Sequence, residues 1–411
     1  MTDVAVGETT GFTYDTDNSL EQVTSFDGST TDYTYDDVGN ITTQTTTVGG
    51  TPFTVNSGYN GLYQLTRVAF GSEGANYAYN ENGNLAGSRT QNDTFTNYSY
   101  NDALLLTQMQ TFAPDGSTIG DFNYTYDANG NWTQVETPAA TINYTYDDLN
   151  RLTSETLADG MLIEYSYDST GNRLTKKVTV GGSSTTTNYQ YGVVNQLTSV
   201  NGTAYTYDDN GNMTSDGVRT YSYDAANRLI EVKEGADTIA SFDYDADGRR
   251  TKMTTASGTV RFHYDGTSTQ VLYETDGSGN LLARYVYGAN GQLLAMSRDG
   301  ETYYYHYNGH GDVIALTDSS GTVAATYEYD AFGNPLSSTG SVENPYRYAG
   351  YRWDNETGLY YLNARYYAPE IGRFITRDSF HGFEDDPASL NQYNYAHSNP
   401  VMFVDPSGYF I

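Results

Sequence analysis

The sequence predicts an all-β protein built from tandem β-hairpins. Three observations support this fold class: the chain contains 42 tyrosines, a hairpin unit recurs along most of its length, and no helical heptads interrupt it. The sequence also has no apolar run of about 18 residues, so we expect no membrane-spanning segment. The length of 411 residues alone suggests two or three domains, but the repeat overrides that expectation.

The stretch YTYDANGNWTQ, at residues 124–134, illustrates the unit. Tyr124 and Tyr126 are two residues apart, so they project from the same face of a strand. Asp127 then leads into an Asn-Gly pair, where we expect positive φ angles to reverse the chain. Trp132 begins the returning strand, which completes a β-hairpin.

The second aromatic residue of this unit recurs at intervals of 16 to 26 residues. These residues are Tyr14, Tyr35, Tyr59, Tyr79, Tyr100, Tyr126, Tyr146, Tyr167, Tyr191, Tyr207, Tyr223, Tyr244, Tyr264, Tyr287, Tyr307, Tyr329 and Tyr348. Such a period is typical of repeat architectures, in which each unit buries its face against its neighbours. Two strands per unit give a ribbon of about 34 strands, roughly 160 Å wide. A twisted sheet of that width must coil or close, so the sequence predicts a wall around a hollow space or a superhelical strip.

The composition favours a core made of tyrosine. Hydrophobic residues make up only 37% of the chain. A tyrosine ring buries apolar area while its hydroxyl still finds a polar partner, so rows of tyrosine can replace a Leu/Ile core. We therefore expect a thin tyrosine-lined wall rather than a deep core.

The charge excludes some partners. The formal net charge is −31, and residues 1–150 carry 19 acidic residues against only Arg67 and Arg89. Such a chain repels nucleic acid, so we expect no nucleic-acid partner.

No cysteine is present, which excludes disulfides and thiol chemistry. The start lacks the basic and apolar regions of a signal peptide. We interpret the chain as a segment of a longer protein that is secreted or displayed at the cell surface.

The repeated patterns YDxxGN and YDxxNR, as in YTYDDVGN from Tyr33 and YSYDAANR from Tyr221, resemble the YD repeats of the Rhs family. That family includes the C components of insecticidal toxin complexes and the teneurin YD shell. The segment from Tyr346 to Tyr409, YRYAGYRWDNETGLYYLNARYYAPEIGRFITRDSF through DPSGY, is similar to the Rhs-associated core domain. The resemblance implies two domains: a YD-repeat hairpin array at residues 1–345 and a core domain at residues 346–411.

The resemblance also implies a function. In the family, the repeats coil into a hollow β-shell that encloses a variable C-terminal effector, and the core domain plugs one end. The implied partner is thus a C-terminal effector polypeptide that this sequence does not contain. Self-association through open sheet edges is a further expectation.

The same resemblance implies a self-cleavage site. Aspartyl proteolysis needs two carboxylates that share a proton. The matching positions are Asp378 in GRFITRDSF and Asp405 in VDPSGY, with Arg377 orienting or tuning the pair. Cleavage is expected at or just after Gly408 and Tyr409. This sequence has Ser379 where the family pattern has Pro, Tyr409 where it has Leu, and an insertion, HGFEDDPASL.

Other interpretations remain open at this point. Asp405-Pro406-Ser407-Gly408 also fits an ordinary turn, with Pro second and Gly fourth. Rows of exposed Tyr with Asp and Asn fit a surface adhesion, carbohydrate-binding or filament-forming scaffold module without catalysis. The run YYYHYNGHGDV carries His306, His310 and Asp312, but its context is strand and turn, so we expect no metal and no cofactor. At most one enzymatic event, self-cleavage, is expected.

Overall fold

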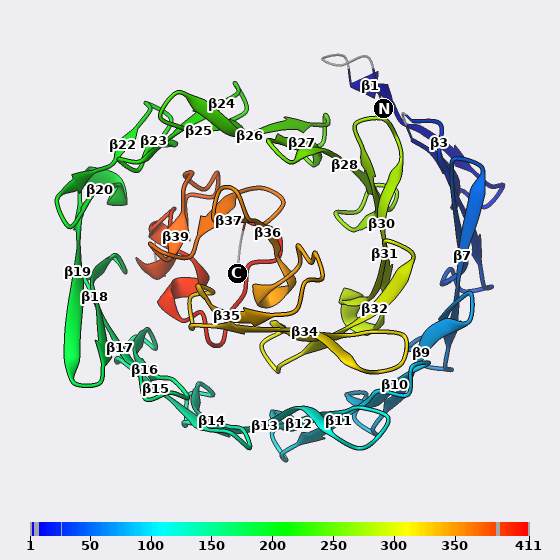
Figure 1. Ribbon diagram of the computed structural model, residues 1–411, viewed down its shortest axis with the longest axis horizontal. Coiled ribbons are helices and arrows are strands. Elements are labelled where there is room, and N and C mark those ends of the chain that lie inside the picture. Colours follow the sequence, from blue (N-terminus) through cyan, green and yellow to red (C-terminus); the bar gives the residue numbers. More distant parts are fainter. Residues whose placement is uncertain (1, 4–7, 26, 384–386, 410–411) are drawn as a thin grey trace.

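The chain forms a scroll of antiparallel strands (Figure 1). This computed structural model describes residues 2–3, 8–25, 27–383 and 387–409. The wall begins at β3, runs once around the molecule through β19 and β27, and then passes inside its own first turn as β28 to β34. The segment that carries β36 to β39 lies at the centre of the scroll. The prediction of an all-β superhelical strip capped by a core segment is confirmed.

The outer turn consists of short strands that follow one another along the chain. The strands of this first part are β1 (Thr2–Asp3), β2 (Glu8–Thr9), β3 (Gly11–Tyr14), β4 (Leu20–Thr24), β5 (Thr30–Tyr35), β6 (Ile41–Val48), β7 (Thr51–Tyr59), β8 (Leu65–Phe70), β9 (Glu73–Tyr79), β10 (Leu85–Thr90), β11 (Phe95–Tyr100), β12 (Leu106–Phe112), β13 (Thr118–Tyr126), β14 (Trp132–Glu136), β15 (Thr141–Tyr146), β16 (Leu152–Thr156), β17 (Leu162–Tyr167), β18 (Arg173–Val180), β19 (Ser183–Tyr191), β20 (Leu197–Val200) and β21 (Thr203–Ala204).

The remaining strands complete the wall and form the centre. They are β22 (Thr206–Tyr207), β23 (Met213–Ser215), β24 (Arg219–Tyr223), β25 (Leu229–Glu234), β26 (Asp237–Tyr244), β27 (Arg250–Thr255), β28 (Gly258–Tyr264), β29 (Val271–Asp276), β30 (Leu281–Tyr287), β31 (Leu293–Arg298), β32 (Glu301–Tyr307), β33 (Val313–Thr317), β34 (Val323–Tyr329), β35 (Pro335–Thr339), β36 (Arg352–Asp354), β37 (Leu359–Tyr361), β38 (Tyr366–Ala368) and β39 (Arg373–Phe374). Five 3₁₀ turns accompany them: η1 (Val193–Asn195), η2 (Ala289–Gly291), η3 (Tyr348–Gly350), η4 (Pro387–Leu390) and η5 (Ala396–Ser398).

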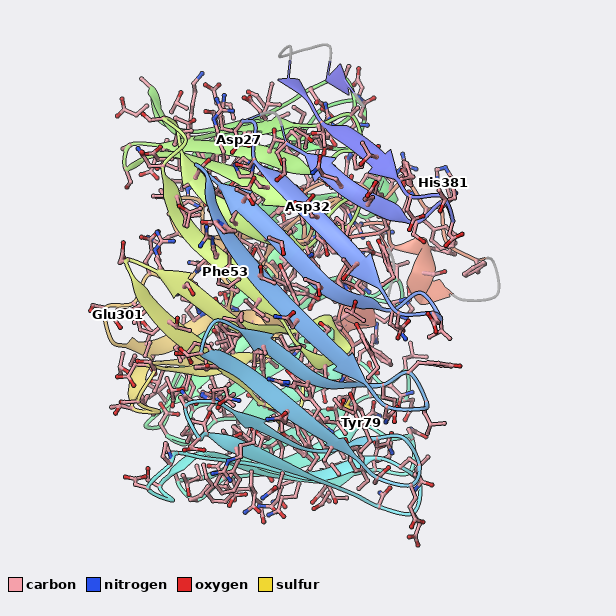
Figure 2. The ribbon with its side chains drawn as sticks, turned by 90° about the vertical axis from the view of Figure 1, so that its right-hand side faces the viewer. Asp27, Asp32, Phe53, Tyr79, Glu301 and His381 are labelled. Carbon is pink, nitrogen blue, oxygen red and sulfur yellow. The ribbon has the colours of Figure 1, made fainter. Side chains whose placement is uncertain are left out.

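The wall is open rather than closed into a barrel. Each strand from β3 to β21 pairs with its neighbours in sequence, and β22 to β35 continue in the same way as a second sheet. Among the described strands, no register joins β21 back to β3. Within the described residues, no helix is long and apolar enough to cross a membrane. Figure 2 views the side of the wall, with Glu301 at one edge and His381 at the opposite edge.

The hairpin turn of many repeats is closed by an aspartate, and in some repeats by an asparagine such as Asn80. In the unit at residues 124–134, the Asp127 Oδ1 accepts the amides of Asn129 (2.8 Å) and Asn131 (2.9 Å). The amide of Gly130 donates to the Asp127 carbonyl at 3.2 Å. Positive φ occurs at Gly130 alone (+87°), so the turn needs glycine at one position rather than an Asn-Gly pair.

The second tyrosine of most repeats links that repeat to the one before it. Next to this tyrosine the register of each hairpin shifts by a β-bulge, as between Thr34 and Tyr35, where Tyr35 faces Ile41. The hydroxyl of Tyr59, in the next repeat, donates to the Ile41 carbonyl at 3.0 Å. We call this bond a tyrosine link. It ties a hairpin to its neighbour at the bulge, where the ladder is interrupted.

Tyrosine links run along both turns of the scroll. The tyrosine and carbonyl pairs are Tyr35–Leu20, Tyr59–Ile41, Tyr79–Leu65, Tyr100–Leu85, Tyr126–Leu106, Tyr146–Trp132, Tyr167–Leu152, Tyr191–Arg173, Tyr223–Met213, Tyr244–Leu229, Tyr264–Arg250, Tyr287–Val271, Tyr307–Leu293 and Tyr329–Val313. The repeated tyrosine therefore donates a hydrogen bond to the backbone and also packs its ring in the wall.

Replacing one link tyrosine with phenylalanine tests this role. In Tyr126→Phe, the hydroxyl that donates to the Leu106 carbonyl at 2.6 Å is lost while the ring remains. We expect the free energy of unfolding to fall by about 0.5–1.5 kcal/mol, measured by urea denaturation. Tyr14→Phe is the control, because Tyr14 is 54% exposed. Equal stability of the two variants would mean that the link contributes nothing.

The two turns of the scroll share a core, which corrects the expectation of a thin wall without one. Outer residues such as Tyr124, Leu152 and Ile163 pack in one cluster with inner residues such as Tyr285 and Met296. Polar bonds also cross between the turns: Asn92 with Thr317 (3.0 Å), the Gly309 amide with the Tyr124 hydroxyl (2.7 Å), Lys176 with Asp330 (2.9 Å), the Ala331 amide with Glu155 (2.8 Å), and the Tyr33 hydroxyl with Asp265. The inner turn thus supplies the buried surface that a single wall lacks.

Glu155 makes the contact between the turns sensitive to pH. Burial, with a smaller contribution from Asp330, raises the pKa of Glu155 to about 8. Because the folded chain holds this proton more tightly than the unfolded chain, stability falls as pH rises from the usual carboxyl range to about 8. We expect the free energy of unfolding to fall with a slope that reaches about 1.4 kcal/mol per pH unit. Glu155→Gln should flatten it in urea denaturation, whereas Glu164→Gln, at an exposed ion pair with Lys177, should leave it unchanged.

Candidate functional site

The candidate site lies in the central segment, which we call the plug: the described residues from Tyr346 to Tyr409. The division of the chain at residue 345 itself stays a prediction. The plug contacts the wall mostly at repeat turns: Asn399 with the Asn131 side chain (2.8 Å), Asn391 with the Asn172 side chain (2.9 Å), Arg373 with the Asn195 carbonyl (2.6 Å), Tyr393 with the Gly211 carbonyl (2.8 Å), and the Met213 amide with the Ile375 carbonyl (2.9 Å). These contacts fix the plug against the rim of the wall.

Two predicted aspartates meet at one arginine. The Nη2 of Arg365 lies 2.8 Å from the Oδ2 of Asp378 and 3.3 Å from the Oδ2 of Asp405. Arg365 directly precedes β38, Asp378 follows β39, and Asp405 lies in the loop after η5. Three segments therefore converge, as the sequence hypothesis of two aspartates from different loops requires. The Arg365 side chain is only 7% exposed.

The DPSG turn is closed by the side chain of its aspartate. The Oδ1 of Asp405 accepts the Gly408 amide at 2.8 Å and the Ser407 hydroxyl at 3.1 Å. The Gly408 carbonyl accepts a hydrogen bond from the Nε of Arg365. Gly408 has a φ of +71°, and a Cβ there would lie 2.4 Å from the Leu362 carbonyl oxygen. Only glycine fits this close approach.

Gly408→Ala tests whether the DPSG turn needs glycine to keep its position against Arg365. The added methyl group would meet backbone atoms, and the left-handed φ would be strained. We expect the Gly408 carbonyl to leave Arg365 and the melting temperature to fall by a few degrees, as measured by calorimetry. Gly116→Ala is the control, because its φ is also positive (+84°) and nothing lies within 4 Å of its added Cβ. Equal loss in both variants would assign the effect to φ alone.

The environment of Asp378 suits a group that exchanges protons. Burial raises the pKa of Asp378 above its usual range, Asp405 adds to the rise, and Arg365 opposes it. The Oδ1 of Asp378 accepts the Phe380 amide at 2.8 Å. A cavity of about 500 Å³ reaches the site; its lining includes Asp378, Arg365, Tyr409, and wall residues from the repeat turns such as Asn212 and Asp247. Water can therefore approach Asp378 from this side.

Arg377, the predicted partner of the pair, lines the same cavity and reaches Asp378 through Gln392. Its side chain is exposed, and its Nε donates to Gln392 Oε1 at 2.6 Å. The Nε2 of Gln392 in turn donates to the Asp378 carbonyl at 2.8 Å. Arg365 holds the position between the carboxylates, and sequence reasoning missed it because 13 residues separate it from Asp378. Residues 384–386 of the insertion lie outside the described part of the chain.

The histidine run lies in a strand and in the turn that follows it. His306 lies in β32 and its Nε2 lies 2.8 Å from the Thr317 hydroxyl, while His310 Nδ1 lies 2.8 Å from Asp312 Oδ1. Among the described residues, no group of three His, Cys, Asp or Glu side chains is placed to hold a metal ion. The strand and turn context predicted for these residues is confirmed.

The family model described as "Teneurin YD-shell" matches residues 132–401, which include the repeats from β14 onward and most of the plug. The chain belongs to the teneurin YD-shell family. Among curated proteins, the tRNA3(Ser)-specific nuclease WapA of Bacillus spizizenii is 42% identical over 359 residues, which cover 86% of this chain and 15% of that protein. The toxin protein Tse5 of Pseudomonas aeruginosa is 26% identical over 389 residues, covering 75% of this chain and 29% of that protein.

A solved structure shares the fold of this YD-shell chain. TcdB2-TccC3 without its hypervariable C-terminal region superposes with a TM-score of 0.73 at 22% identity, covering 97% of this chain and 21% of that one. The likeness establishes the shell fold for the scroll and plug together. The present chain spans only about a sixth of the length of the WapA relative.

Proposed function

We propose that this chain is the terminal part of the shell, with its plug, of an exported YD-repeat protein that holds a C-terminal effector polypeptide and releases it by a single self-cleavage. The observation that carries the proposal is the convergence of Asp378 and Asp405 on Arg365, beside Gly408, in a plug surrounded by the wall. The names of the relatives agree with it, since they include nucleases, a toxin, and a protein with a hypervariable C-terminal region.

The chemistry follows from the two carboxylates. Asp378 takes a proton from a water molecule in the cavity, and the water oxygen bonds to the carbonyl carbon of a peptide bond next to Tyr409. When the carbon–nitrogen bond breaks, the leaving nitrogen receives that proton from Asp378, so atoms and charge balance. Asp405 keeps the Gly408 amide in place and so holds the peptide beside Asp378. One water is consumed, and a new carboxyl group and a new amine form.

Intact mass spectrometry of the chain with a reporter polypeptide fused after Ile411 tests the proposal. We expect two products, one of which ends at Gly408 or Tyr409, with the reporter released from the shell chain. A single uncleaved mass after prolonged incubation between pH 4 and pH 9 would contradict self-cleavage. Size-exclusion chromatography of the cleaved sample then asks whether the reporter stays associated with the shell.

The alternative of a carbohydrate-binding surface receives less support. The hydroxyls of most repeat tyrosines donate to wall carbonyls in tyrosine links, and many of their rings are packed inside the wall. A sugar-binding row needs exposed rings and free polar groups. The repeat tyrosines are therefore better explained as elements of the shell.

A further inference from the structure

We propose that the chain binds a small aromatic molecule with an uncharged carbonyl oxygen in a second cavity, between the inner turn of the scroll and the plug. This cavity measures about 420 Å³ and is lined by residues from β27 to β32 and from the plug (Figure 1). Leu362 and Asn363 line it, whereas the next two residues, Ala364 and Arg365, line the cavity at Asp378. The two cavities share no lining residue, so this binding site is separate from the proposed cleavage site.

The lining of the second cavity suits an aromatic ring. Its buried part carries rings that include Phe262, Tyr346 and Tyr361, and its mouth carries exposed residues of a repeat turn, Asn290 and Gln292. Cavities of roughly 300–1,000 Å³ with aromatic walls and a few polar groups are typical of small-molecule sites. Among the described residues that line it, none is Asp or Glu, although the chain has 51 acidic residues. The lining therefore offers rings and hydrogen-bond donors rather than carboxylates.

Two buried arginines supply donors for a ligand oxygen. Arg250 and Arg352 both line the second cavity, and their side chains are only 1% and 9% exposed. The Nε of each has no hydrogen-bond partner among the described residues. The Nε of Arg352 lies 3.9 Å from the Oδ1 of Asp354, beyond hydrogen-bond reach. A buried N–H without an acceptor is unfavourable, so these two groups favour a ligand that brings an oxygen atom.

The ligand oxygen is uncharged because the charges of both arginines are already balanced. Arg250 forms a bidentate pair with Asp354, and the Nη1 of Arg352 donates to Glu274. Arg298, 3.9 Å from Glu274, has a second carboxylate as its own partner. A ligand carboxylate would add a negative charge to this buried group of balanced ions, and an uncompensated buried charge is strongly unfavourable. A carbonyl oxygen accepts the same N–H groups without adding that charge.

Aromatic contacts hold the two donors in place. The central carbons of the Arg250 and Arg352 guanidinium groups lie 5.0 Å and 4.5 Å from the centroid of the Phe262 ring. The guanidinium of Arg250 also lies 4.3 Å from the centroid of the Tyr361 ring. Donors that are oriented before a ligand arrives lose little conformational freedom when it binds. Even a small ligand therefore gains from both groups.

Isothermal titration calorimetry of the chain with benzamide tests the site. Benzamide joins one ring to one uncharged carbonyl, and we expect a dissociation constant of about 1 mM or lower for a ligand of about nine heavy atoms. Two molecules of similar size are the comparison: benzoate carries a negative charge, and toluene lacks an acceptor. Each should bind at least about 10-fold more weakly than benzamide, because the first adds a buried charge and the second leaves the donors unpaired.

Three variants locate the bound benzamide. Gln292→Trp places an indole ring at the mouth and should weaken binding by about 10-fold or more, since the ring blocks entry. Leu105→Trp is the matched control, because Leu105 directly precedes β12 as Gln292 directly precedes β31, and it does not line the second cavity. Arg352→Lys keeps a charge beside Glu274 but removes the guanidinium Nε, so we expect binding to weaken by about 2- to 10-fold. Melting temperatures confirm that each variant folds.

The proposal is supported if benzamide binds more tightly than benzoate and toluene and if Gln292→Trp weakens its binding while Leu105→Trp does not. It is overturned if the folded chain binds no benzamide at about 10 mM, if benzoate or toluene binds as tightly, or if binding is unchanged in Gln292→Trp. If Gln292→Trp does not fold, Thr269→Trp, at another exposed position of the mouth, takes its place. Self-cleavage is measured separately with the reporter fusion, so failure of this site leaves the proposed function standing.

Discussion

Asp378→Asn is expected to abolish self-cleavage of the reporter fusion. The carboxylate that takes the proton from water is replaced by an amide that cannot accept one, and general-base contributions are typically 10²–10⁴-fold. In the wild type, the rate should rise with pH through the pKa of Asp378, which burial places above its usual range, because the base must be ionised. The measurement is a time course of intact mass between pH 4 and pH 9.

Two further variants are compared with Asp378→Asn. Asp247→Asn changes a carboxylate on the wall side of the same cavity, 41% exposed, and should leave the rate unchanged. Asp405→Asn removes the charge that faces Arg365 but keeps an oxygen able to accept the Gly408 amide, so we expect slower cleavage with the fold retained. Cleavage in Asp378→Asn at the wild-type rate would show that another group provides the base.

Arg250→Met is expected to weaken the attachment of the plug to the wall. Arg250, in β27, is fully buried, and its guanidinium forms a bidentate pair with Asp354 of β36, in the plug. Its guanidinium also lies 4.3 Å from the centroid of the Tyr361 ring. Removing one partner of a buried pair leaves the other charge uncompensated, and such changes cost about 3–5 kcal/mol. We expect a loss of that size in the free energy of unfolding, measured by urea denaturation.

The double variant Arg250→Met with Asp354→Leu separates charge from packing. Because it removes both charges, it should be less destabilised than Arg250→Met alone. Arg228→Met, at the partly exposed pair with Asp224, should change stability by about 1 kcal/mol or less. If Arg250→Met were as stable as Arg228→Met, the buried pair would not hold the plug.

The sequence was sufficient for the parts of the fold that depend on neighbouring residues. The spacing of Tyr124 and Tyr126 and the Asp127 turn are local, so the hairpins and their period could be predicted. The entry of β28 to β34 inside the first turn depends on curvature summed over many strands, which no single repeat encodes. The tyrosine links were also missed, because they use carbonyls at bulges that appear only once the strands are paired.

The candidate site, like the fold, could be predicted from the sequence only in part. The resemblance of GRFITRDSF and VDPSGY to the Rhs core located Asp378 and Asp405, and the structure brings both to one nitrogen atom. Arg377 was chosen because it is adjacent in sequence, yet successive residues on an extended chain point to opposite sides. Arg365 reaches the site from a different strand, so only the folded plug reveals it.

Hydrogen–deuterium exchange measured by NMR at two amides tests the scroll most directly. The Gly309 amide donates to the Tyr124 hydroxyl across the two turns, and the Met213 amide donates to the Ile375 carbonyl between wall and plug. We predict that both exchange as slowly as the amides of the paired inner strands, because opening them requires separation of the turns or of the plug. Exchange at the rate of an unstructured chain, with the inner strands still protected, would contradict a wall wound around its own plug.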